Sequence, residues 1–586
     1  MGEQKNLFLA IGLSIAIIVI FQFLSPQQAL IDKPINKETS QEVIEPSNSI
    51  DDNQSTSIAT IKSRDEIISK SNRVNIKTPS LIGSINLTGA ILDDLILTKY
   101  NKRLNDDSEK ITLFSPDGTT NPYYFQLGWN QLKSSEPKVD LPNHETIWAA
   151  SSSELTPDKP VILSWTNNQN IKFQLKFSVD NDYLFDVIQT VENNSSSEIK
   201  LFPYRLIKRI NLPDTINFFI LHEGLISLTN DKLQEKKYDH LLDDCNEDSD
   251  TKKLFCNETT TGGWLGFTDK YWMATLIPDQ EKTITADYRH KNNGRDDFRV
   301  GYTGNNMEIS PQQKISYNGK IFAGAKSLKI LSNYMENGIP KFTDSIDWGW
   351  FAFLTKPISY ALNWFYSLKF VENFGLAIIA FTILMRLILF PLAQASFKSM
   401  AKMKKLQPEM QRLKETYPDD RQKMQQELMA LYKKEGANPV AGCLPVIVQI
   451  PIFFSLYKVL FVTIEMYHAP FYGWIHDLSA PDPIGLMTLF GLIDWEIPKR
   501  GMLSILNFVN IGILPIFMGF TMWLQQKLNP APADPTQAKI FALLPFVFTF
   551  VLAGFAAGLV LYWSINNILS IAQQWFIQRR ILAKNA

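Results

Sequence analysis

Residues 381–411 have the sequence FTILMRLILFPLAQASFKSMAKMKKLQPEMQ and change from an apolar run into a basic amphipathic pattern. The apolar part contains a single charge, Arg386, and completes a candidate membrane span at 374–391. After Pro391, methionine and leucine recur every three or four residues among lysines, which is typical of a helix with one apolar face. The stretch therefore predicts a membrane-embedded helix that leads into a basic, water-exposed segment.

Two further apolar runs, at 443–464 and 503–524, are each long enough to cross a hydrocarbon core of about 30 Å. The run at 540–577 would form a helix of about 56 Å, so two spans are expected there. Gly554 and Gly558 mark the expected turn of this transmembrane hairpin.

Two other segments are also expected to meet the membrane. Residues 1–24 include a long uncharged stretch and predict an anchoring span, with a cleaved signal peptide as the alternative. The aromatic-rich segment 346–373 is interrupted by lysine and proline, so it is expected to lie in the membrane interface as an amphipathic helix. The sequence thus predicts a polytopic α-helical membrane protein with six spans.

The distribution of charge orients these spans. Lys and Arg total 58 and Asp and Glu total 59, which excludes a globally basic nucleic-acid-binding protein. The segment 392–442 carries ten basic residues, whereas 466–502 carries only Lys499 and Arg500, so the first of these is expected in the cytoplasm. Both termini, including the short tail 578–586, are then cytoplasmic, and the region after the first span is periplasmic.

The periplasmic region divides into two parts. Residues 25–72 are rich in Pro, Ser, Asn and acidic residues and predict a flexible linker. From 73 to 340, apolar and polar residues alternate, as in 171–179, and turn-forming residues separate the alternating runs. This pattern predicts a large antiparallel β-supersandwich.

The cysteines and histidines favour structural roles. Cys245 and Cys256 enclose ten residues of a polar periplasmic loop and are candidates for a disulfide, while Cys443 is expected to be free. His222 beside Glu223 resembles an acid–base pair, but neighbours on a strand point to opposite faces. Because the sequence has no GxxxxGK loop and no metal-ligand spacing, we expect no cofactor, no metal site and no enzyme activity.

Arg386 is the most informative residue inside the predicted spans. A guanidinium at the centre of a membrane helix costs roughly 2.5–3.5 kcal/mol, so it usually faces a wet cavity or a partner; snorkelling to the cytoplasmic headgroups is the alternative. Thr382 lies four residues earlier on the same helical face. Other predicted spans contribute polar or aromatic residues: Gln449, Tyr562, Trp563, Asn566 and Asn567. Interhelical hydrogen bonding explains each of them singly, but together with an unpaired arginine they predict a hydrated groove that attracts acidic or polar peptide segments.

Residues 392–442 predict a cytoplasmic helical hairpin that is broken at Pro418. Its apolar stripe either packs the two helices together or offers adaptable methionine side chains to apolar segments of a substrate. Its basic residues either form a solvated face near anionic lipid or contact ribosomal RNA. The candidate contact residues for a substrate or the ribosome are Met400, Met403, Lys404, Lys405, Met410 and Arg412.

Several stretches resemble the YidC/Oxa family of membrane protein insertases. They are residues 381–411, GANPVAGCLPVIVQIPIFFSLY at 436–457 and GLVLYWSINNILSIAQQ at 558–574, and GGW at 262–264 followed by KYWMATLIP is similar to the periplasmic domain of the Gram-negative YidC branch. The resemblance implies that Arg386 is the positive residue of a hydrophilic groove open to cytoplasm and lipid, and that Thr382 and Trp563 line the substrate path. Tyr562-Trp563 replaces the Tyr-Tyr of many relatives, and Lys458 replaces an aromatic or apolar residue.

The resemblance implies an insertase that integrates and folds nascent inner-membrane proteins without nucleotide hydrolysis, alone or with the Sec translocon. The implied partners are nascent membrane proteins, the Sec translocon, the ribosome and signal recognition particle pathway, and the lipid bilayer. The implied location is the bacterial inner membrane. Two other functions stay open: a secondary transporter for an anionic substrate, which should show repeated halves, and a membrane-anchored periplasmic carbohydrate-binding protein.

Overall fold

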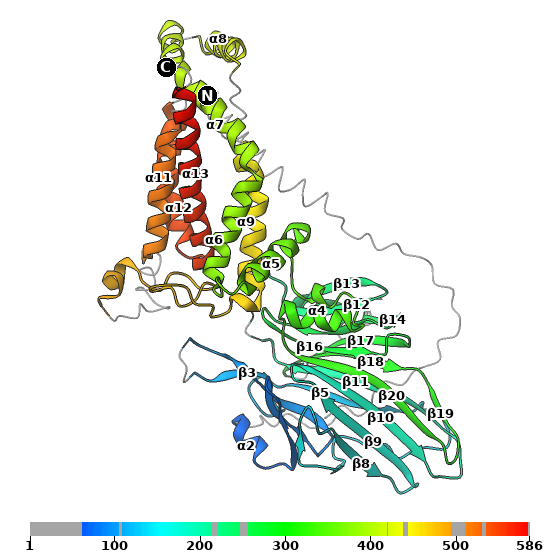
Figure 1. Cartoon of the computed structure of the whole chain (residues 1–586). Helices are drawn as coiled ribbons and strands as arrows, with labels where there is room; N and C mark the ends of the chain where they lie inside the picture. Colours follow the sequence, from blue (N-terminus) through cyan, green and yellow to red (C-terminus); the bar gives the residue numbers. More distant parts are fainter. Residues whose placement is uncertain are drawn as a thin grey trace, which may run out of the picture. The chain divides into compact units, whose positions relative to one another are not determined.

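The computed structural model describes residues 61–104, 108–213, 215, 221–245, 256–292, 294–418, 420–436, 444–493, 510–529 and 535–583. The expected N-terminal anchor, most of the expected linker and Cys443 lie outside the described residues. Within these ranges the chain forms a two-sheet β domain followed by a set of long helices (Figure 1).

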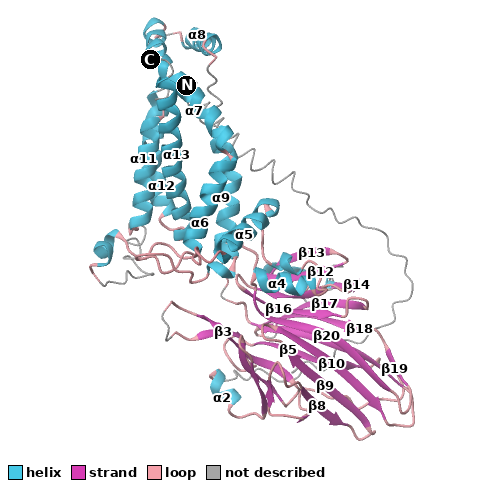
Figure 2. Cartoon of the chain, in the orientation of Figure 1, coloured by secondary structure: helices cyan, strands magenta, loops and turns pink. Residues whose placement is uncertain are grey.

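The β domain consists of two sheets, drawn in magenta in Figure 2. The larger sheet contains 11 strands among the described residues, with β19 beside β11 and β4 beside β3. Its order is β14 (Asn257–Thr261), β17 (Thr283–Asn292), β18 (Asp296–Gly304), β11 (Ile199–Ile210), β5 (Tyr123–Asn130), β3 (Ile91–Asn101), β2 (Leu81–Asn86), β1 (Arg73–Lys77) and β7 (Glu154–Leu155), with β19 at Met307–Ile309 and β4 at Lys110–Phe114. Apart from the parallel pair of β1 and β7, the neighbouring strands are antiparallel.

The second sheet has nine strands, all paired antiparallel with their neighbours within the described residues. Its order is β13 (Lys232–Lys237), β12 (Gly224–Thr229), β15 (Trp264–Thr268), β16 (Trp272–Pro278), β20 (Lys314–Ala325), β10 (Leu184–Asn193), β9 (Ile171–Val179), β8 (Val161–Thr166) and β6 (Ala149–Ala150). The antiparallel β-sandwich predicted from the alternating sequence is confirmed.

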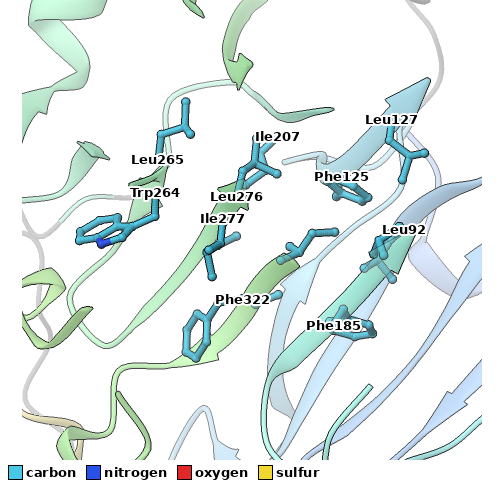
Figure 3. Packing of buried hydrophobic residues seen from close by; sticks show 14 of the residues in the cluster. Leu92, Phe125, Leu127, Phe185, Ile207, Trp264, Leu265, Leu276, Ile277 and Phe322 are labelled. Atoms are coloured by element: carbon cyan, nitrogen blue, oxygen red, sulfur yellow. The ribbon is translucent and has the colours of Figure 1, made fainter. Parts of the chain in front are cut away.

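The alternation of side chains along the strands produces the core between the sheets. In β9, Phe173, Leu175 and Phe177 are fully buried, while the residues between them face outward. Figure 3 shows side chains from both sheets in one cluster, including Phe125 of β5 and Phe322 of β20. Each buried side chain of this size contributes about 1.5–3 kcal/mol relative to an exposed one.

The short helices around the sheets are α2 (Arg64–Ile68), α3 (Tyr238–Asp244), α4 (Leu328–Glu336) and η2 (Phe342–Ser345). Cys245 follows α3 and forms a disulfide with Cys256, with Cα atoms 5.7 Å apart and within the limit of about 7 Å. Both cysteines belong to the buried core cluster. The bond therefore fastens α3 and the start of β14 to the core instead of joining two solvent-exposed positions.

The C-terminal part consists of helices, drawn in cyan in Figure 2. They are α5 (Ala352–Ser367), α6 (Phe374–Ile388), α7 (Phe390–Thr416), α8 (Arg421–Lys434), α9 (Leu444–Val462), η4 (Ile464–Met466), η5 (Leu486–Gly491), α11 (Ile513–Leu528), α12 (Pro535–Leu552) and α13 (Ala557–Ala583). Helix α13 contacts α6, α7, α9 and α11 and thereby connects most of the set.

The helices follow the sequence pattern with shifted boundaries. α5 buries Ile358 and Leu362 and exposes Phe353 and Trp364, so apolar side chains lie on both its packed and its exposed sides. The interfacial position expected for residues 346–373 stays a prediction. α12 and α13 are separated at 553–556, where the glycine-rich turn was expected. α7 and α8 are consecutive helices that contact each other, and the cytoplasmic position of this hairpin stays a prediction.

The candidate membrane spans differ from the expected ones in length. Among the described residues, no single helix is both long and apolar enough to cross a membrane. The pair α6 and α7 satisfies these criteria together, with a bend of 66° between the two helices, and shorter apolar helices occupy Ile447–Val462 and Ala538–Leu552. The number of spans therefore stays a prediction.

Reduction of the disulfide should destabilise the β domain. A bond that closes a loop of about ten residues contributes roughly 2–4 kcal/mol, mainly by restricting the unfolded chain. Thermal unfolding of the purified full chain should show a lower Tm after reduction and in the Cys256→Ser variant. Cys443→Ser is the matched control and should keep the Tm of the unchanged protein; equal Tm values for all of these samples would contradict a stabilising role for the bond.

Candidate functional site

Arg386 lies in the last turn of α6 and reaches across to α13. Its Nε donates to Asn566 Oδ1 at 2.8 Å, and its Nη2 donates to the Asn566 carbonyl oxygen at 3.1 Å and to the Ser570 hydroxyl. Asn566 and Ser570 lie four residues apart, so one face of α13 presents both acceptors. The guanidinium is therefore bonded between two helices and does not extend alone toward the headgroups.

The partners of Arg386 are all neutral. Within the described part of the chain, the guanidinium forms hydrogen bonds to an amide, a carbonyl and a hydroxyl, and no carboxylate pairs with it. Such bonds satisfy the donors but leave the positive charge uncompensated. Leu387 and Ile388 next to it are 64% and 60% exposed, so an apolar surface borders this charge. The site can attract a carboxylate or another strong acceptor from a bound peptide.

A second polar contact joins α9 to α13. Gln449 Nε2 donates to the hydroxyl of Tyr562, which is almost fully buried and lies one turn before Asn566. Trp563 packs edge-on against Phe453 of α9, with ring centroids 4.7 Å apart. Tyr562 and Gln449 thus extend the polar contacts along α13, while Trp563 contributes an apolar wall beside them.

Thr382 and Asn567 form hydrogen bonds to residues outside the Arg386 cluster. Thr382 is 1% exposed, and its hydroxyl donates to the Ile378 carbonyl of its own helix at 2.6 Å. Asn567 Nδ2 donates to Thr521 Oγ1 of α11 at 3.1 Å. Because their polar atoms are already satisfied, both residues support helix conformation and packing in this structure.

The candidate contact residues of the cytoplasmic hairpin divide into two groups. Met410 is buried and accepts a hydrogen bond from Tyr432 of α8 at a sulfur–oxygen distance of 3.6 Å, and Met400 packs against the cluster of Ala393, Phe397 and Ile577. These two methionines therefore have packing roles. Met403 is half-buried, and the remaining basic candidates are exposed: Lys404, Lys405 and Arg412.

Lys458 of α9 is paired with a carboxylate in this structure. It forms an ion pair with Asp347 at 2.6 Å, in which both side chains are nearly buried. Asp347 also accepts a hydrogen bond from the backbone N–H of His222 at 2.8 Å. The pair connects α9 to the segment between η2 and α5, so Lys458 has a structural role at this position.

His222 is not part of an acid–base pair. Its Nε2 lies 2.8 Å from the Leu225 carbonyl oxygen, and burial lowers the pKa of the imidazole to about 4. The ring is therefore neutral near pH 7 and stabilises the local backbone.

Ser570 and Asp347 also hold polar contacts of the site region, although neither is expected from the sequence. Ser570 had a usable signal, because it lies four residues after Asn566 and shares its helical face. Asp347 had none, because its partner Lys458 is distant along the chain and no local periodicity relates the two positions.

Two protein-family descriptions match the chain: the 60Kd inner membrane protein family over residues 364–584 and the YidC periplasmic domain over residues 73–361. The chain belongs to the YidC family of membrane protein insertases. The membrane protein insertase YidC of Granulibacter bethesdensis is 44% identical over 99% of this chain and 98% of its own length. That of Dinoroseobacter shibae is 44% identical over 99% of this chain and 96% of its own.

A solved structure of an active YidC insertase, with its first transmembrane domain resolved, covers 86% of this chain and 92% of its own chain. The identity is 17% and the TM-score 0.36. The family relationship confirms the resemblance found in the sequence: the chain is an insertase that integrates inner-membrane proteins and has a periplasmic domain. Membrane protein insertase is not an enzyme class.

Arg386→Ala and Asn566→Ala should have non-additive effects on insertion, because both variants remove the same contact. Insertion of a substrate with an acidic translocated segment should fall in each, and the double variant should be little worse than Arg386→Ala. Protease protection of the substrate in proteoliposomes measures this. Asn567→Ala is the matched control on α13, and its effect should add to that of Arg386→Ala. Simple additivity of Arg386→Ala and Asn566→Ala would contradict the assigned contact.

Proposed function

We propose that this YidC-family insertase holds hydrophilic segments of nascent membrane proteins at the Arg386 site while the neighbouring apolar segments enter the lipid. The observation that carries the proposal is the uncompensated guanidinium, whose partners on α13 are Asn566 and Ser570. Residues Leu387 and Ile388 expose an apolar surface beside it. A substrate can therefore place a polar segment and an apolar segment on adjacent surfaces.

The energy for insertion comes from the transfer of apolar side chains from water into hydrocarbon. The barrier to insertion is the free energy of moving the polar segment of the substrate out of water. This desolvation costs several kcal/mol unless the segment forms hydrogen bonds to the protein. A positive charge in a medium of low dielectric attracts a carboxylate more strongly than the same charge in water does. The Arg386 guanidinium can exchange neutral acceptors on α13 for a substrate carboxylate and then return to them on release, so no nucleotide or cofactor is required.

The topology is part of the proposal. We infer six spans: 1–24, 374–391, 443–464, α11 (Ile513–Leu528) in place of the expected 503–524, and two within 540–577. Both termini are then in the cytoplasm and the β domain is in the periplasm. The apolar runs and the ten basic residues at 392–442 support this orientation. The bent pair α6 and α7 is consistent with a span that continues into the cytoplasmic hairpin.

The partners that we propose are the Sec translocon, the ribosome and signal recognition particle pathway, and the lipid bilayer. The exposed basic residues of α7 support contact with ribosomal RNA or anionic lipid: Lys404, Lys405 and Arg412. No observation on the described residues favours the transporter or the carbohydrate-binding alternative, and the relatives that match nearly the whole chain are insertases.

Substitution of Arg386 should affect insertion according to charge. Arg386→Ala should reduce insertion of substrates with acidic translocated segments by roughly 5- to 30-fold, which corresponds to about 1–2 kcal/mol. Arg386→Lys keeps the charge but loses the forked geometry, so it should retain more activity. The measurement is insertion of matched neutral and acidic substrates at equal membrane levels of each variant. Equal insertion by Arg386→Ala and the unchanged protein across all substrates would remove Arg386 from the site.

Deletion of residues 75–320 should leave insertion measurable. This deletion removes most of both sheets but keeps Asp347 and the helices that carry the Arg386 site. The test compares insertion by the deletion variant and the full chain after checking that both reach the membrane in equal amounts and the same orientation. A stable, correctly oriented deletion variant without activity on any substrate would contradict the assignment of function to the helical part.

A further inference from the structure

The loop between α9 and α11 carries an exposed apolar tip, which we define as residues 486–493. The sequence from Pro483 to Ile493 contains eleven residues without a charge, between Asp482 and Asp494. Most large side chains of the tip point outward: Leu486 is 42% exposed, Leu489 51%, Phe490 42%, Leu492 87% and Ile493 46%. Surface apolar residues usually occur singly, so a contiguous group marks a contact surface.

The tip is fixed to the start of α11. The Asp482 carboxylate accepts a hydrogen bond from the backbone N–H of Leu514 at 2.8 Å, and Asn510 Oδ1 accepts from the N–H of Met487 at 3.0 Å. The backbone N–H of Leu486 donates to the Ile511 carbonyl at 3.0 Å. The position of the tip along the membrane normal is therefore set by the first turn of α11.

A glycine makes this attachment possible. A Cβ atom at Gly485 would lie 2.0 Å from Asn510 Oδ1, so a larger residue would displace the Asn510 side chain that bonds to Met487. The tip itself contains two consecutive residues in the left-handed region, Leu489 at φ 45° and Phe490 at φ 56°. Bulky residues in this region cost of order 1–3 kcal/mol each and persist where the surroundings compensate. The strained backbone at Leu489 and Phe490 occurs in a conformation in which both apolar side chains are exposed.

The length of α11 indicates the depth of the tip. Its 16 residues correspond to about 24 Å, which is about 6 Å less than a hydrocarbon core of ~30 Å. The other end of α11 carries Lys527, whose ammonium lies 5.2 Å from the ring centroid of Trp523, a combination typical of the headgroup region. The missing apolar length is therefore at the end where the tip is attached.

We propose that residues 486–493 insert into the outer leaflet as an apolar wedge and contact lipid acyl chains. The inference rests on the proposed topology, in which the loop between α9 and α11 faces the periplasm. The wedge completes the apolar width of α11 and anchors its periplasmic end beside the lipid-facing surface. Lipid is a better occupant than the sequence that follows, because residues 494–500 include four charges in seven positions.

The test places an environment-sensitive fluorophore on Leu492→Cys in a Cys443→Ser background, in the full chain reconstituted into phosphatidylglycerol–phosphatidylethanolamine vesicles. His476→Cys is the matched control, because His476 is an exposed polar residue of the same loop. We expect nitroxide-labelled lipids to quench the probe at 492 several-fold more than the probe at 476, and aqueous iodide to show the reverse order. Leu489→Cys provides a second position if labelling at 492 impairs folding.

Three results are decisive against the wedge or its placement. Equal iodide quenching at 492 and 476 would show that the tip is in water. Protection of 492 from both quenchers would show that protein covers it, and either result overturns the proposal while leaving the insertase function intact. Labelling of His476→Cys by an impermeant maleimide only from the cytoplasmic side would overturn the proposed topology, and with it the outer-leaflet location, whatever the lipid quenching shows.

Discussion

The hydrogen bonds of Arg386 to α13 are the constraint on which the helical part depends. A guanidinium among apolar helices is tolerated only when its donors are satisfied, and the acceptors here are Asn566 and Ser570. This requirement fixes the rotation of α13 about its axis. On the same helix, Tyr562 contacts Gln449 of α9 and Asn567 contacts Thr521 of α11, so polar contacts join α13 to three helices: α6, α9 and α11.

Lys458 and Arg386, two cations of the described helices, are used in opposite ways. Lys458 pairs with Asp347, and the charges cancel in a fixed, nearly buried contact that ties α9 to the segment before α5. The partners of Arg386 among the described residues are neutral, so its positive charge remains available to attract a substrate carboxylate. Breaking a buried ion pair leaves an uncompensated charge and costs several kcal/mol, whereas exchanging a neutral acceptor for a substrate carboxylate keeps the guanidinium hydrogen-bonded and costs much less. The Lys458–Asp347 ion pair therefore suits a permanent structural contact, and the neutral partners of Arg386 suit a transient contact with a substrate.

The sequence predicted features that follow from short-range periodicity. The alternating residues 171–179 form β9, and the turn near Gly554 separates α12 from α13. The segment with the methionine and leucine stripe forms the two helices α7 and α8. The sequence did not predict hydrogen-bond partners where a side chain has several possible acceptors. Thr382 lies on the helical face expected for the groove, yet its hydroxyl bonds to the backbone of its own helix, which no spacing rule distinguishes from a groove-lining position.

Helices α6 and α11 are both shorter than the hydrocarbon core, and this shortness bears on the apolar tip and on the Arg386 site. α6 has 15 residues and α11 has 16, or about 22 Å and 24 Å, against a hydrocarbon core of ~30 Å. A mismatch of this size costs a fraction of a kcal/mol per ångström unless the bilayer thins or other apolar groups complete the width. In the proposed topology, α5 and the apolar residues 486–493 would supply such groups at the outer side. At the inner side, α6 ends beside Arg386 and the bend to α7, so a polar substrate segment that reaches Arg386 has a shorter stretch of hydrocarbon left to cross.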